Sequence, residues 1–272
     1  MDTHLTLREL AYDDLAACLE LAADRGWAAE ENKWALLLDL GTGYGLFDAA
    51  GRLVGTTIVT RYGGDQAVVS MVLVAADHGG QGLGRRLMTH ALEHVDRPVV
   101  SLHATAMGRP LYEKLGFRAV GRLTRYVGVF PANGLSGTTR AALQADLPDV
   151  VRTDSEVFGA ERVALWKDYF RFTDQVRLGP GGGFAATWRT VDSLVVGPVV
   201  ADSADEAKTL ISDLAVGVDG NLQVDVYHDD LGSWLERQGM VERSSVDLMV
   251  RGANDVPGDR KRLHVPLMQA LG

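Results

Sequence analysis

The sequence predicts an α/β protein of two tandem halves, each a mixed, mostly antiparallel sheet flanked by helices. Three observations carry this prediction: apolar residues that alternate between strand and helix periodicity, a glycine-rich turn that joins a strand to a helix, and a segment that repeats in the second half. At 272 residues, with 46% hydrophobic and 23% charged residues, the chain is long enough for two ordinary domains.

The first elements are predicted from a change of period. Alternation predicts a strand over 5–10, and helical spacing predicts an amphipathic helix from about 13 to 25, ended by Gly26. A short helix over 34–38 ends at Gly41. Three strands with short turns then follow, which implies an antiparallel meander over 44–47, 53–61 and 67–74.

The glycine-rich turn after residue 74 opens a helix over 83–94, whose apolar residues recur on one face. Pro98 marks the next boundary. We expect a short strand over 99–102, a helix over 107–115 that is closed by Gly116, and a longer strand over 117–130.

The end of this half is repeated later in the chain. Residues 111–117, Leu-Tyr-Glu-Lys-Leu-Gly-Phe, align with residues 234–240, Trp-Leu-Glu-Arg-Gln-Gly-Met, at an offset of 123 residues. The same offset places Leu87 on Leu210, so we infer a duplication. It divides the chain into a cofactor-binding domain over 1–130, a turn-rich linker over 131–138 and a degenerate second domain over 139–251. An apolar tail over 252–272 is expected to dock on the fold.

Composition excludes several functional classes. The net charge of −9 opposes a nucleic-acid partner, because phosphate backbones are bound by clustered cations. The sequence has no 18-residue apolar run and no signal-peptide pattern at its start, so we expect a cytoplasmic location without a membrane partner. Cys18, the only cysteine, is expected to be a small buried hydrophobe. A monomer and a homodimer both remain open.

The strongest chemical signal is a strand that leads through glycines into a helix. Free backbone N–H groups at a helix N-terminus, together with the helix dipole, attract phosphate, and glycines let it approach closely. The strand is Val72, Leu73 and Val74, and the predicted anion-binding turn and helix start are Gly79, Gly80, Gln81, Gly82, Leu83, Gly84 and Arg85. The glycine spacing fits no dinucleotide fingerprint, and Arg86 stands where a Walker loop needs a hydroxyl. A glycine turn without a ligand remains the alternative.

These residues resemble the acetyl-CoA signature of the GCN5-related N-acetyltransferases, Gln/Arg-x-x-Gly-x-Gly/Ala, over residues 79–84; Gly79 departs from the family's Gln or Arg. Residues 104–117 resemble the family's later helix, with Thr105 and Gly108 in place of its commoner Asn and Ala. The resemblance covers about residues 4–130, and the whole chain is similar to a two-domain branch. It implies acetyl-CoA as co-substrate, held by the backbone of Val72, Leu73 and Val74.

The resemblance also implies catalytic roles. Tyr112 matches the family's general acid, since a phenol with a pKa near 10 stays protonated at neutral pH; the alternative is a core tyrosine. His103, Glu30 and Glu31 are weaker candidates for the base, and water could take the proton instead.

Trp27 and Trp34, seven residues apart, would share a helix face and could wall the substrate pocket, although such a pair is more often core. We expect no metal, because the histidines suggest no ligand spacing. In the second half Asp205 and Leu235 occupy the positions of Gly82 and Tyr112, which predicts a domain without cofactor or catalysis. The expected function is N-acetylation of a small-molecule amine. The alternatives are protein-lysine acetylation and a non-catalytic acetyl-CoA-binding regulator.

Overall fold

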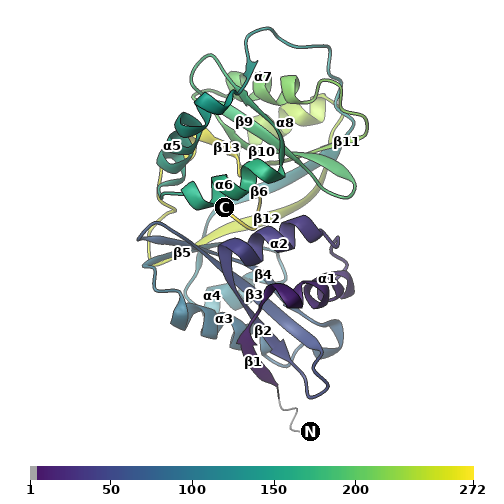
Figure 1. Cartoon of the computed structure of the whole chain (residues 1–272), viewed down its shortest axis with the longest axis vertical. Coiled ribbons are helices and arrows are strands. Elements are labelled where there is room, and N and C mark those ends of the chain that lie inside the picture. The colour runs from purple at the N-terminus through teal and green to yellow at the C-terminus, as the bar shows by residue number, and fades with distance from the viewer. Residues whose placement is uncertain (1–4) are drawn as a thin grey trace.

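A computed structural model describes residues 5–272 (Figure 1). The first half has the predicted order of strands and helices. Its elements are β1 (Thr6–Glu9), η1 (Tyr12–Asp14), α1 (Leu15–Asp24), α2 (Glu31–Leu40), β2 (Gly41–Phe47), β3 (Leu53–Tyr62), β4 (Gln66–Val74), η2 (Ala76–His78), α3 (Leu83–His94), β5 (Val99–Ala104), α4 (Arg109–Lys114) and β6 (Arg118–Gly128).

The second half repeats this order from α5 onward. Its elements are β7 (Arg140–Ala141), η3 (Gln144–Asp146), α5 (Leu147–Phe158), α6 (Val163–Phe172), β8 (Thr173–Leu178), β9 (Phe184–Arg189), β10 (Ser193–Val200), α7 (Ala204–Leu214), β11 (Asn221–Val226), α8 (Asp229–Arg237), β12 (Val241–Arg251), η4 (Arg260–Arg262) and β13 (Leu263–Val265).

Helices cover both faces of the first sheet. In β2, a Cβ placed on Gly43 would contact Leu38 of α2, whereas the next residue, Tyr44, packs edge-on against His90 of α3 with ring centroids 4.7 Å apart. Successive side chains of a strand point to opposite faces, so α2 and α3 lie on opposite faces. The predicted antiparallel meander β2–β3–β4 is confirmed.

The two halves share one continuous sheet because they exchange strands. The order is β1-β2-β3-β4-β5-β12-β6-β11-β10-β9-β8-β7, so β12 of the second half pairs with β5, and β6 of the first half pairs with β11. The predicted fold class, two tandem halves that each contain a mixed sheet flanked by helices, is confirmed, and the structure adds that the two sheets join into one.

The pairing of β6 with β12 supports the predicted offset. Leu123 pairs with Val246, which lies 123 residues further along the chain. The ladder skips Val120 in one strand and Arg243 in the other, and these bulges are also 123 residues apart. The two strands therefore cross at a local twofold axis that relates the halves.

The apolar tail docks at the junction of the halves, as expected (Figure 1). Leu267, Met268 and Leu271 are buried, and Tyr62 of β3 donates a hydrogen bond to the carbonyl of Leu271. Beside the tail, the Arg162 guanidinium makes two bonds to the Asp154 carboxylate, at 2.6 and 2.8 Å, with both side chains almost fully buried. Cys18 is buried in the core, where burial raises the pKa of its thiol to about 12.

Over residues 5–272, no helix is long and apolar enough to span a bilayer.

Candidate active site

The site begins where two parallel strands separate. β4 and β5 pair from Gln66–Val99 to Val69–Leu102, after which β4 continues to Val74 without a partner on that edge among the described strands. Met71 lies in this stretch with a φ of 51°, at a bulge in the β3–β4 ladder. A non-glycine residue in this region is strained, and such strain concentrates at functional sites. The strand therefore presents an open edge that includes Val72, Leu73 and Val74.

The glycine turn leaves a helix N-terminus unsatisfied. Gly80 and Gly82 have φ values of 75° and 76°, and Gly82 is the N-cap of α3 without a side-chain cap. From Gly80 to Arg85, no backbone N–H donates a hydrogen bond to another described residue, and the first helical bond is from Arg86 to the carbonyl of Gly82. Nothing lies within 4 Å of a Cβ placed on Gly80 or Gly82. The turn thus offers space, free donors and the positive end of the helix dipole to an anion.

Neighbouring side chains extend this anion site. Gln81 and Arg85 are exposed, and Arg85 forms no ion pair with a described residue. Gly84 faces inward, where a Cβ would lie 3.4 Å from Leu111 of α4 and 3.8 Å from Val74 of β4. The turn is therefore packed directly against both the open strand and the helix that carries Tyr112.

Tyr112 lies on α4 directly after Leu111, the residue that packs against Gly84 of the turn. Its side chain is 8% exposed and packs on Phe117, and its hydroxyl forms no hydrogen bond within residues 5–272. That oxygen is nevertheless not sealed from solvent. Burial raises the pKa of the phenol to about 12, so the hydroxyl stays protonated and can donate a proton.

His103 follows the last residue of β5 that pairs with β4, and it is held at both ring nitrogens. Nδ1 lies 2.9 Å from the carbonyl of Gln269, and Nε2 lies 3.0 Å from the hydroxyl of Tyr227. Because a carbonyl can only accept, Nδ1 donates and Nε2 accepts from the tyrosine. Burial lowers the pKa of His103 to about 4, so the ring is neutral but already engaged.

The residues expected around the substrate do not all converge. Glu30, the N-cap of α2, forms an ion pair with Lys33, and Glu31 begins α2 in an exposed position. Trp27 lies in the loop before α2 and is 42% exposed, whereas Trp34 lies within α2 and is fully buried. Because Trp27 lies outside the helix, the two tryptophans share no helix face, and Trp34 is part of the core, as the alternative interpretation expected.

In the second half, the matching cleft is occupied by the chain itself. β10 and β11 pair in parallel up to Val196–Val224, but the next stretch of β10 pairs with β13 from the tail. At the start of α7, the Ser203 hydroxyl accepts a hydrogen bond from the N–H of Glu206, while the Glu206 carboxylate binds the N–H of Gly181 at 2.8 Å. Ser203, rather than Asp205 or the Glu206 carboxylate, therefore caps this helix; Asp205 binds Lys208 instead.

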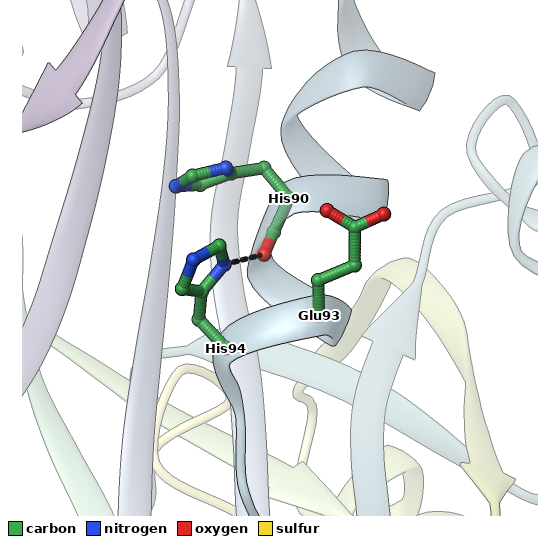
Figure 2. A group of neighbouring side chains, drawn as sticks. All are labelled: His90, Glu93 and His94. Atoms are coloured by element: carbon green, nitrogen blue, oxygen red, sulfur yellow. Dashed lines mark hydrogen bonds between the residues drawn. The ribbon is translucent and has the colours of Figure 1, made fainter.

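A group of three possible metal ligands was missed from the sequence. His90, Glu93 and His94 lie at the C-terminal end of α3, with one ligand atom from each within 4.8 Å of the others (Figure 2). The expectation that no histidines show ligand spacing is wrong, because His90 and His94 are four residues apart on one helix. His94 Nδ1 donates to the carbonyl of His90 at 2.8 Å, which leaves Nε2 free. The group lies at the opposite end of α3 from the glycine turn.

Two polar residues at the junction also went unnoticed in the sequence. Tyr227 follows β11 and contacts His103 from the other half. Lys33 is partly buried, and burial lowers the pKa of its amine to about 8, with opposing contributions from Arg125 and Asp225. No sequence motif marks either residue, because the partners of each come from the other half or from strands that the exchange brings together.

Family models match both halves of the chain. The description "acetyltransferase (GNAT) domain" applies to residues 38–130 under one model and to residues 150–265 under another.

Similar proteins agree with these matches. The chain is 25% identical over its whole length to the full length of an uncharacterised N-acetyltransferase, YitH, of Bacillus subtilis. It is 26% identical to a holothin acyltransferase of Pseudoalteromonas, over 80% of this chain and 78% of that protein. A putative acetyltransferase of Pyrococcus horikoshii has the same fold, with a TM-score of 0.86 at 18% identity over 98% of this chain and 96% of the other.

The environment of His103 predicts a pH dependence of stability. Its folded-state pKa of about 4 lies below the ordinary value of 6.5, so the unfolded state binds this proton first as the pH falls. Stability is therefore lost between pH 6.5 and 4, by about 2 kcal/mol at pH 5. Urea unfolding at pH 7 and pH 5 should show a smaller loss for His103→Gln than for the wild type. Equal losses would contradict the neutral, enclosed ring.

Proposed function

The chain is an acyltransferase and a tandem member of the GCN5-related N-acetyltransferase (GNAT) superfamily. We propose that its first half transfers acetyl from acetyl-CoA to the amine of a small molecule. In this proposal the second half binds no cofactor and has a structural role.

The observation that carries the proposal is the contrast between the two clefts. In the first half, the edge of β4 beyond Val69 is unpaired and the start of α3 is uncapped. In the second half, β13 covers the matching edge of β10, and Ser203 caps α7. An extended pantetheine arm can pair with an open strand edge, and a diphosphate can bind free N–H groups. Both features remain available only in the first half.

The proposed chemistry is direct attack of a neutral amine on the thioester carbonyl. A tetrahedral oxyanion forms first, and the carbon–sulfur bond then breaks to release a thiolate. A backbone N–H of the open β4 edge is suited to stabilise the oxyanion, because such donors act most strongly where charge develops. The Tyr112 hydroxyl is suited to protonate the departing sulfur, since it has no competing hydrogen bond within the described chain.

The proton lost by the amine needs a separate route. His103 is engaged at both nitrogens, and Glu30 is bound to Lys33. Glu31 is exposed at the start of α2. We therefore propose that this proton passes to water rather than to one of these three side chains.

The glycine turn gives the direct test of cofactor binding. Gly82→Asp places a negative charge at the start of α3, where it repels a diphosphate, while Asp remains a good N-cap that tolerates positive φ. We expect the affinity for CoA, measured by calorimetry, to fall at least about 100-fold, or about 2.7 kcal/mol. The matched control is Ser203→Asp at the N-cap of α7, for which the affinity should stay within about twofold. Tight binding to Gly82→Asp would remove the proposed phosphate site.

The role of Tyr112 is tested by removing one oxygen. Tyr112→Phe should lower kcat about 100-fold or more, because general acid catalysis contributes factors of this order, and should leave the affinity for CoA unchanged. Release of free thiol from acetyl-CoA with a panel of amines measures kcat. The control is Tyr126→Phe, another buried tyrosine, which should retain activity. Full activity of Tyr112→Phe would refute the assignment, and no turnover of any amine by the wild type would favour the regulator.

A further inference from the structure

Four cationic side chains gather at the junction of the two halves. Lys33 comes from α2, Arg125 from β6, Arg162 from the start of α6 and Arg260 from η4 in the tail. The charge of Arg125 helps to lower the pKa of Lys33, and the charge of Arg162 helps to lower the pKa of Arg260. Arg162 and Arg260 also act on Tyr227, which meets His103 of the first half.

Three of these four cations have a carboxylate partner. Lys33 pairs with Glu30, Arg125 forms two bonds to Asp225 at 2.7 and 2.8 Å, and Arg162 forms two bonds to Asp154. Arg260 has no carboxylate within ion-pair distance among residues 5–272. A cation withdrawn from water without a counter-charge is costly, so this side chain needs a reason to be there.

The surroundings of Arg260 hold it in place without using its main donors. Nε donates to the carbonyl of Pro257 at 2.8 Å, and the guanidinium stacks over the ring of Phe158 at 4.3 Å. An arginine has five N–H donors, so the four on the two terminal nitrogens remain without a described partner. Those nitrogens are not sealed from solvent, and desolvation lowers the pKa of the group to about 10. A ligand can therefore reach the free end of the fork from solvent.

Arg260 lies close to the first half, because Phe158, on which it stacks, also packs edge-on against Tyr62 of β3 with ring centroids 5.0 Å apart. His103 is the first residue of β5 after the last pair with β4, and its Nε2 accepts from the hydroxyl of Tyr227. Among the neighbouring charges, Arg260 lowers the pKa of Tyr227 the most, and it also lowers the pKa of His103. A molecule whose amine enters the opening at His103 could thus reach Arg260 with another of its groups.

We propose that Arg260, supplied by the second half, binds a carboxylate of the acceptor, so that the acceptor is an amine that also carries a carboxylate, as amino acids do. This inference rests on the proposed function. The arginine fork matches the two oxygens of a carboxylate, and one unpaired cation matches one negative charge. A phosphate dianion would leave a charge unbalanced, because the other three cations are already paired.

The test measures the binding of possible reaction products, so it requires neither turnover nor a known substrate. N-acetylamino acids and the matching N-acetylamino acid amides, which differ only in the carboxylate, are titrated by calorimetry into the protein saturated with CoA. We expect at least one acid to bind the wild type 10-fold or more tightly than its amide, as charged hydrogen bonds of this kind contribute. Arg260→Gln should reduce this preference to within about twofold. Lys261→Gln, an exposed neighbour in η4, should preserve it.

A second variant keeps the test decisive if Arg260→Gln does not fold. Arg260→Lys retains the charge but loses the two-pronged fork, so it should weaken binding of the acid about 3- to 10-fold and leave binding of the amide unchanged. The inference is overturned if Arg260→Gln or Arg260→Lys keeps the full preference, or if CoA binds and no acid is preferred to its amide. Failure of CoA itself to bind would instead overturn the proposed function, and this inference with it.

Discussion

The pairing of β6 with β12 is the constraint on which the rest of the structure depends. Each strand leaves its own half and completes the sheet of the other, so neither sheet is complete without both halves. The two bulges, at Val120 and Arg243, preserve the local symmetry of the crossing. As a result the C-terminal ends of β5 and β11 face one another, and His103 and Tyr227 meet across the junction. The second half thereby contributes a group that contacts the end of β5 in the first half.

The halves show how one fold can either keep or close a ligand site. An open strand edge and an uncapped helix both leave backbone groups that need partners. In the first half these groups are free, at the edge of β4 and at the start of α3. In the second half β13 and Ser203 supply the partners from within the chain. Closing the second cleft also brings the tail, with Gln269 and Arg260, to the junction.

Local signals in the sequence predicted most of the first half. The spacing of apolar residues and the position of the glycines gave α3 with its observed bounds, and the meander and the glycine turn were confirmed. The strand exchange was not predicted, because a strand's periodicity states which face is buried and not which distant strand it joins. For the same reason Tyr227, Lys33 and Arg260 carried no signal.

Other errors were local. The spacing of His90 and His94 was present in the sequence and overlooked. A pocket wall formed by both tryptophans required one helix over 27–34, but a loop separates Trp27 from α2. The cap of α7 was assigned two residues too late, because α7 begins earlier than the 123-residue offset implies, and Ser203 therefore takes the position expected for Asp205.

The central claim is that one cleft accepts the cofactor while its duplicate is closed by the tail. The number of CoA molecules bound per chain, from calorimetric titration of the intact protein at saturating ligand, tests it most directly. The account predicts one molecule per chain. Two molecules, which would require β13 to leave β10, or none would contradict it.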